Sequence, residues 1–178
     1  LAEAYGMTKD KKLKKPLESA VKYLVEKHQS LGQAFSYSPN SPGDMSNSAA
    51  IIMAIKDAQV SGIKADYDKS YKCVKDWFKK VSRGEHGGLG CYEPRKNVKD
   101  TATAIKMFSN QLLGMKRGDP SMRESGLYLS RFGVKGSGKS FHYTDDISNY
   151  KKLPAYYYLY YGSLAMFQYG GKEWKKWN

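Results

Sequence analysis

The sequence has few of the residues that usually build covalent or metal-bound frameworks. Its 178 residues include two cysteines and three histidines, and 17 Asp and Glu stand against 30 Lys and Arg, a formal net charge of +13. Two cysteines cannot build a disulfide scaffold. Cys73 and Cys91 could form a single bridge, but two free, mostly buried thiols are the favoured interpretation. The shortage of acidic residues favours a polyanionic partner, such as an acidic polysaccharide or a membrane surface.

Several segments of known function are also missing. No secretory signal peptide is visible, and no helix-turn-helix, RNP aromatic pair or zinc module points to nucleic acid. Residues 153–171 carry no charge, a length that could span a bilayer. This run opens near Pro154 and is rich in tyrosine, which prefers membrane interfaces to the hydrocarbon centre. A buried helix is therefore expected there, and no transmembrane segment.

What the sequence does contain is an internal repeat. Three segments share the pattern G-x-x-x-x-Y, namely Gly32–Tyr37, Gly87–Tyr92 and Gly138–Tyr143. Glycines also follow apolar helical runs at similar intervals, at Gly6, Gly62, Gly114 and Gly170. A glycine just past a helix commonly adopts the left-handed conformation that ends it. Such regular spacing is typical of stacked repeats.

Two kinds of helix alternate between these markers. Amphipathic outer helices are predicted in 17–25 and 67–81, because apolar residues recur there at intervals of three and four residues. A third is predicted from Asp119-Pro120 onward, where an N-cap residue precedes a proline at the first helical position. Inner helices, apolar nearly all round, are predicted over 46–60, 100–113 and 153–169. The prediction is an all-α fold of about three helical hairpins, with repeats at 7–62, 63–114 and 115–170. Half-repeats at 1–6 and 172–178 suggest a single domain, 1–178, cut from a longer chain.

The pattern resembles the α/α toroids of terpenoid cyclases and prenyltransferases. Gln29–Phe35 and Asp44–Ser46 are similar to the Q-x-x-G-x-x-F and D-x-S elements of those repeats. A closer resemblance, to bacterial proteins with squalene-cyclase-like repeats, is carried by three C-terminal segments: Tyr156–Tyr161, Met166–Gly171 and Trp174–Asn178. The resemblance implies a partial α/α toroid and export from a bacterium.

The catalytic motifs of that superfamily are absent. The chain has no D-x-D-D, the cyclase acid motif, and its only acidic doublet is Asp145-Asp146, in a predicted loop. The zinc set of protein prenyltransferases needs three or four converging ligands, whereas the candidates lie in different repeats: His28, Cys73, His86, Cys91 and His142. No metal site and no cofactor are expected. Whether the protein is an enzyme is left open, and the absence of both motifs favours a protein without catalytic activity.

One stretch matches a nucleotide-binding motif. Gly133–Ser140 satisfies G-x-x-x-x-G-K-S, which cradles phosphate between a buried strand and a helix N-terminus. The preceding residues, 124–132, have a helical pattern instead. A basic hairpin loop is therefore the favoured interpretation.

The candidate ligand site is the mouth of a toroid cavity, at the inner-helix N-termini. Aromatic-walled hollows with a few polar groups are common ligand sites. The candidates are Tyr37, Asp44, Ser46, Tyr92, Asp100, Thr101, Tyr143, Tyr156, Tyr157, Tyr160 and Tyr161. For the three loop tyrosines the favoured alternative is structural, with each ring packed under its loop.

Three functions follow. The first is a binding or scaffold module that has lost the cyclase acid, with a small hydrophobic or polyanionic ligand. The second is an enzyme acting on isoprenoid-like lipids. The third is an acidic-polysaccharide binder or lyase, for which His142, Tyr143, Asn149 and Tyr150 could serve. Open repeat edges would also allow self-association.

Overall fold

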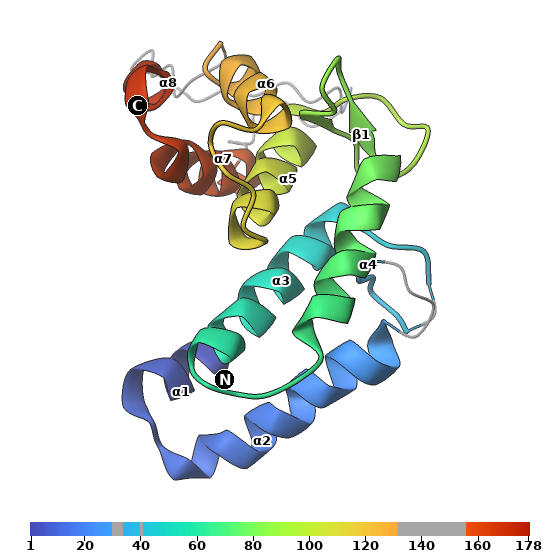
Figure 1. The fold of residues 1–178 in the computed structure, drawn as a ribbon, viewed down its shortest axis with the longest axis vertical. Coiled ribbons are helices and arrows are strands. Elements are labelled where there is room, and N and C mark those ends of the chain that lie inside the picture. The colour runs from blue at the N-terminus through green and yellow to red at the C-terminus, as the bar shows by residue number, and fades with distance from the viewer. Residues whose placement is uncertain (30–33, 40, 132–155) are drawn as a thin grey trace. The chain divides into compact units, whose positions relative to one another are not determined.

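The computed structural model describes residues 1–29, 34–39, 41–131 and 156–178, and it is mainly helical (Figure 1). The chain divides into two compact units, 1–80 and 81–178. The prediction of a helical fold is confirmed. No helix in the described ranges is long and apolar enough to cross a bilayer.

Unit 1 is built around one apolar helix. It contains α1 (Ala2–Thr8), α2 (Lys11–Lys22), which continues as a π-helical turn (Tyr23–His28), α3 (Met45–Val60) and α4 (Tyr67–Lys80). α3 contacts the other three helices and buries Ala49, Ile52 and Ile55 completely. α2 and α4 bury only one face each, and their lysines are exposed. The predicted division into inner and outer helices is therefore present in this unit.

The ends of these helices show one correct and one wrong glycine prediction. Gly62 follows α3 in the left-handed region, at φ 92°. Gly6, in contrast, lies inside α1, and the left-handed residue after α1 is Lys9, at φ 53°. A Cβ at Gly6 would lie 2.8 Å from Ser61 Oγ, so this glycine permits close packing against the end of α3.

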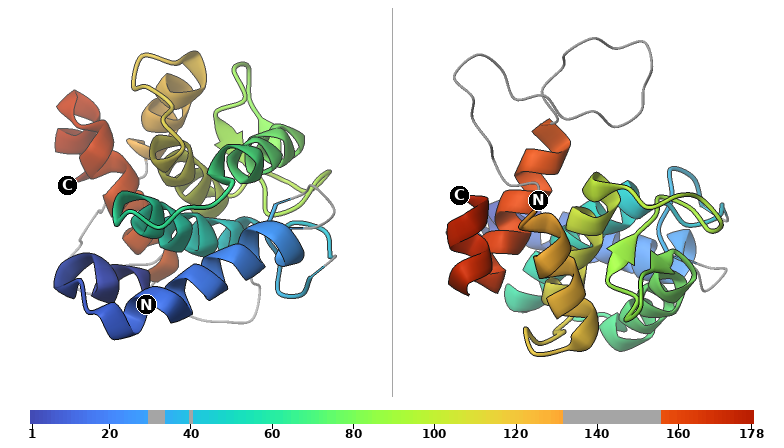
Figure 2. Two further views of the ribbon diagram at one scale, coloured as in Figure 1. Left: turned by 60° about the horizontal axis from the view of Figure 1, so that its bottom comes forward. Right: turned by 90° about the horizontal axis from the view of Figure 1, so that it is seen from above.

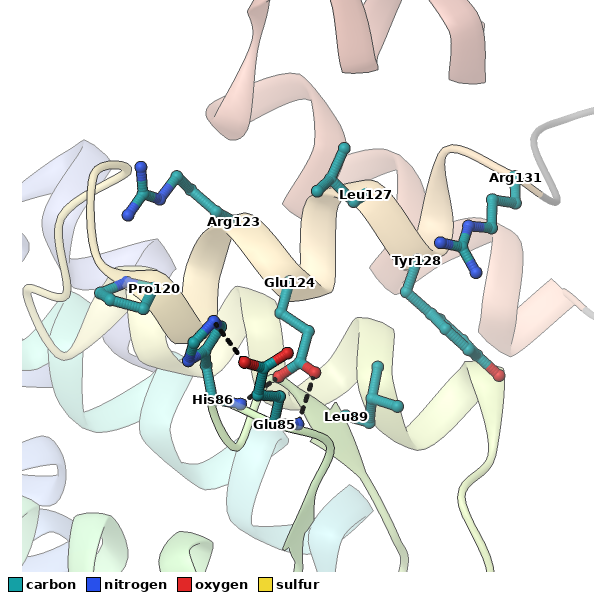
Figure 3. Close-up of a pocket in the computed structure, with 9 residues that line it drawn as sticks. All are labelled: Glu85, His86, Leu89, Pro120, Arg123, Glu124, Leu127, Tyr128 and Arg131. Carbon is teal, nitrogen blue, oxygen red and sulfur yellow. Dashed lines mark hydrogen bonds and ion pairs between the residues drawn. The ribbon is translucent and has the colours of Figure 1, made fainter.

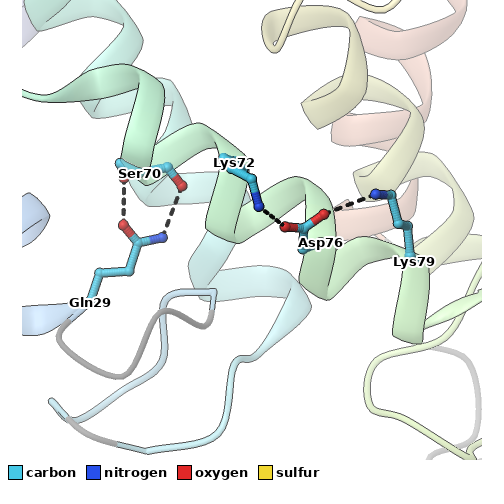
Figure 4. A network of polar contacts seen from close by, with 5 residues as sticks. All are labelled: Gln29, Ser70, Lys72, Asp76 and Lys79. Atoms are coloured by element: carbon cyan, nitrogen blue, oxygen red, sulfur yellow. Dashed lines mark hydrogen bonds and ion pairs between the residues drawn. The ribbon is translucent and has the colours of Figure 1, made fainter.

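A buried side-chain pair joins the end of the π-helical turn to α4 (Figure 4). Gln29 Nε2 donates to the Ser70 carbonyl oxygen (3.1 Å), and Ser70 Oγ donates to Gln29 Oε1 (2.6 Å). Gln29 begins the Q-x-x-G-x-x-F element, so the glutamine of this motif has a structural partner here. On the exposed face of α4, Asp76 pairs with Lys72 and Lys79, which lower the pKa of Asp76 to about 2.

Unit 2 combines helices with a small hairpin that the sequence patterns did not predict. β1 (Ser82–Arg83) pairs antiparallel with β2 (Leu89–Gly90), and α5 (Asp100–Leu112), α6 (Pro120–Leu129), α7 (Tyr156–Tyr169) and α8 (Gly171–Trp177) follow. α5 packs against β2, α6 and α7 (Figures 1 and 2). Strands of two residues are too short to show an apolar-polar alternation in a sequence.

The two inner helices of unit 2 run in the same direction. Gln111 Nε2, near the end of α5, donates to the Ala165 carbonyl oxygen of α7 (2.9 Å). At the other end, Asp100 is close enough to Tyr158 for its charge to contribute to that residue's raised pKa. Gly114 and Gly170 both adopt positive φ, 85° and 69°, as predicted for glycines after inner helices.

Candidate functional site

The candidate site is a groove on unit 2 between the β1–β2 hairpin and α6, with a volume of about 460 Å³ (Figure 3). α6 and Arg131 just after it contribute one wall, and the hairpin contributes the other. Its lining combines apolar, aromatic and charged side chains: Glu85, His86, Leu89, Pro120, Arg123, Glu124, Leu127, Tyr128 and Arg131.

Two arginines lie along this groove, Arg123 within α6 and Arg131 just after its end. The helix begins with an Asp119 cap, whose side chain accepts from Ser121 N–H (2.8 Å), and with Pro120 at its first position, as the sequence predicts. The two arginines are eight residues apart in the sequence, and α6 ends at Leu129, between them. Both are exposed, and neither pairs with a carboxylate among the described residues. Their guanidinium groups are therefore available to an anionic ligand.

The hairpin turn is held in place by one carboxylate from α6. Glu124 accepts backbone hydrogen bonds from Glu85 N–H (2.8 Å), His86 N–H (3.1 Å) and Gly88 N–H (2.6 Å). Glycine is required here, because a Cβ at Gly88 would lie 2.5 Å from the Ser121 carbonyl oxygen. The groove wall thus depends on a contact between residues 36 to 39 positions apart.

A buried lysine lies behind the turn. Lys106 of α5 is 2% exposed, and its Nζ donates to the carbonyl oxygen of Gly87. Burial lowers the pKa of Lys106 to about 8, although the Glu124 and Asp119 carboxylates oppose that shift. Ser121 Oγ also donates to the Gly87 carbonyl (3.3 Å). α5 and α6 therefore both hold this turn.

Lys106 makes the stability of the protein depend on pH. Above pH 8 the folded protein releases the Lys106 proton, while the unfolded chain keeps it up to its ordinary value near 10.5. Stability rises with pH wherever the unfolded state binds more protons. Between pH 8 and pH 10, the free energy of unfolding should rise by about 2 kcal/mol relative to Lys106→Met. Parallel denaturant titrations of the two proteins check this, and equal pH slopes would contradict it.

Beside the groove, three polar side chains converge at the start of α5. Tyr128 of α6 donates its hydroxyl to Asp100 Oδ1 (2.5 Å). Burial, and secondarily the Asp100 charge, raises the pKa of Tyr158 on α7. The sequence predicted Asp100 as a site residue, but it missed Tyr128, which had no marker beyond its place in an outer helix. The hydrogen bond fixes the Tyr128 ring at the end of the groove.

The structure gives the other loop and cap candidates local roles. Asp44 caps α3 by accepting from Asn47 N–H (2.8 Å), and Ser46 Oγ donates to the same carboxylate (2.6 Å). Tyr37 is 81% exposed, so the prediction that its ring packs under the loop is wrong. The loop is filled instead by Phe35, which is completely buried.

In unit 2, Tyr92 is half-buried and Thr101 is buried. The tyrosines of α7 form an aromatic cluster at its first turns. Tyr161 is buried and contacts the rings of Tyr157 and Tyr160 at 5.0 Å between centroids. Tyr156, Tyr157 and Tyr160 are exposed. Asp100 and α7 thus share one end of unit 2, but no described contact joins these exposed tyrosines to the groove.

Several predicted residues lie outside the described ranges. These are the phosphate-motif segment Gly133–Ser140, the doublet Asp145-Asp146, and the lyase candidates His142, Tyr143, Asn149 and Tyr150. Among the described residues, no group of three metal-ligating side chains occurs. Cys73 and Cys91 are free thiols, and burial raises the pKa of Cys91.

The fold and the groove define a helical-hairpin protein with an external, arginine-lined groove. No family model matches the chain, and neither does any curated protein or solved structure.

Proposed function

We propose that this protein is a binding module that holds an acidic polysaccharide in the groove between α6 and the hairpin. The proposal rests on one observation above all, the pair Arg123 and Arg131 on the open side of the groove. Arginine presents a planar fork of donors that suits carboxylate and sulfate groups. Because the two are eight residues apart and α6 occupies most of the interval between them, a ligand that contacts both must be extended.

The other groups in the groove support this choice. The Glu124 carboxylate already accepts three backbone hydrogen bonds, so its negative charge is largely compensated. Glu85 Oε1 lies 4.0 Å from His86 Nε2, so a protonated His86 imidazole offsets the negative charge of Glu85. Between the arginines, Leu127 and the fixed Tyr128 ring offer apolar surface, on which the C–H face of a sugar can pack.

The finer architecture is part of the proposal. An arc of an α/α toroid, related to the terpenoid-cyclase and prenyltransferase repeats, would account for the alternation of apolar and amphipathic helices. The glycine positions after α3, α5 and α7 support it. We propose binding without cyclase-type catalysis, since the chain carries no D-x-D-D. Activity on isoprenoid-like lipids stays an alternative prediction. That the protein has no cofactor and does not bind nucleic acid also stays a prediction.

The test separates the groove from net charge. Titration of the protein with a heparin hexasaccharide should show affinity falling about tenfold or more in the double variant Arg123→Gln/Arg131→Gln, because two charge-assisted contacts are lost. The matched control is Lys175→Gln/Lys176→Gln, which removes two exposed charges from α8. The control should lose less than about threefold, from the general electrostatic attraction alone. An equal loss in both variants would contradict the proposal.

A further inference from the structure

The hairpin turn has the geometry of an anion-binding site. The backbone N–H groups of Glu85, His86 and Gly88 converge on the two oxygens of one carboxylate, at 2.6 to 3.1 Å. Gly84 and Gly87, at φ 90° and 68°, turn the chain so that these groups point to the same side. Successive backbone N–H groups in such turns form concavities that bind anions.

The electrostatics of the turn also suit one negative group. Lys106 donates to the Gly87 carbonyl, and its charge interacts with that of Glu124. A buried ammonium without a nearby anion is costly. With Glu124 in place, the turn holds one anion and one cation. If the Glu124 carboxylate moved away, the half-buried Gly88 N–H, the exposed N–H groups of Glu85 and His86, and Lys106 would remain for another anion.

Glu124 itself borders the open groove (Figure 3). Its carboxylate is carried by a flexible side chain on the same helix as Arg123, one position further along. An acidic ligand lying along α6 therefore brings its own carboxylate or sulfate beside the turn.

We infer that the turn 84–88 is an anion-binding subsite of the groove, occupied in the free protein by the Glu124 carboxylate, and that an acidic group of the bound polysaccharide takes its place. Glu124 then acts as a tethered competitor of the ligand. This inference rests on the proposed function for the identity of the ligand, but the anion site itself does not.

The inference predicts the sign of a mutational effect. If Glu124 competes with the ligand, Glu124→Ala should bind a heparin hexasaccharide about tenfold more tightly, because three donors become available to it. If Glu124 only positions the hairpin, the same variant should bind more weakly.

The matched control is Glu85→Ala, which removes an exposed carboxylate from the same groove and measures the effect of charge alone. The gain in hexasaccharide affinity from Glu124→Ala must exceed the gain in affinity from Glu85→Ala. Adding Lys106→Met should abolish the first gain and leave the second. A Glu124→Ala variant that gains no more than Glu85→Ala would overturn the inference.

A second measurement tests the subsite without any sugar. Sodium sulfate should raise the melting temperature of Glu124→Ala saturably at millimolar concentration, beyond the general stabilisation that sulfate gives to the wild type and to Glu85→Ala. If Glu124→Ala does not fold, Glu124→Gln, which keeps the side-chain volume, replaces it under the same criteria.

The two proposals fail in different ways. Saturable sulfate binding without hexasaccharide binding would retain the subsite and reject the polysaccharide. A sulfate response equal to that of the wild type would reject the subsite, whatever the arginine variants show.

Discussion

Replacing Gly90 by alanine should destabilise the protein by about 3 kcal/mol, because overpacking against rigid neighbours costs this much. A Cβ at Gly90 would lie 2.5 Å from the Ala102 carbonyl oxygen, 2.7 Å from the Ala102 carbonyl carbon and 2.9 Å from Thr103 N. All three atoms belong to the backbone of α5, so no side-chain rotation can relieve the contact. The strand β2 must move away from α5, and the hairpin wall of the groove moves with it.

Denaturant unfolding followed by circular dichroism measures this loss. The control is Gly118→Ala, because no atom lies within 4 Å of a Cβ at Gly118 and its φ lies outside the left-handed region. The control should change the free energy of unfolding by less than about 1 kcal/mol, in the stabilising direction. Similar losses in both variants would mean that β2 does not pack against α5 as described.

The second large effect is expected in the loop before α3. Phe35→Ala should lower the free energy of unfolding by about 4 kcal/mol, because it removes a completely buried aromatic ring. The Phe35 carbonyl oxygen also accepts from Asp44 N–H (2.8 Å) and Ser48 Oγ (3.0 Å), so this residue fixes the start of α3. Emptying its site leaves a cavity beside the ring of His28, whose centroid lies 6.0 Å from that of Phe35.

Tyr37→Ala is the matched variant in the same loop. Its ring is 81% exposed, so its removal should change stability by less than about 0.5 kcal/mol. Both variants are compared by thermal and denaturant unfolding under the same conditions. A larger loss for Tyr37 than for Phe35 would restore the prediction that the loop tyrosine is the packed residue.

The helical repeat was predictable because it depends on local periodicity. The described inner helices begin and end within a few residues of the predicted ranges, and three of the four marked glycines adopt positive φ. The prediction for Gly6 was wrong because this glycine permits close packing against Ser61. A glycine needed for packing between distant residues cannot be distinguished, in the sequence, from a glycine that ends a helix.

The groove was not predictable for a related reason. Its geometry depends on Glu124 reaching the amides of a turn 36 to 39 residues earlier, and no periodic pattern encodes such a contact. The sequence did contain one signal of a tight turn, the four glycines Gly84, Gly87, Gly88 and Gly90. The repeat pattern G-x-x-x-x-Y needs only one of them. Asp100 was predicted as a site residue, but its partner Tyr128 emerged only from the packing of α6 on α5.

The central claim is that the groove on unit 2 binds an acidic polysaccharide, and an NMR titration of the labelled protein with a heparin hexasaccharide tests it most directly. The predicted result is saturable shifts of the Arg123 and Arg131 guanidinium signals and of the backbone amides of Glu85, His86 and Gly88. Shifts confined to the exposed lysines of α2 and α4, or to the α7 tyrosines, would contradict it.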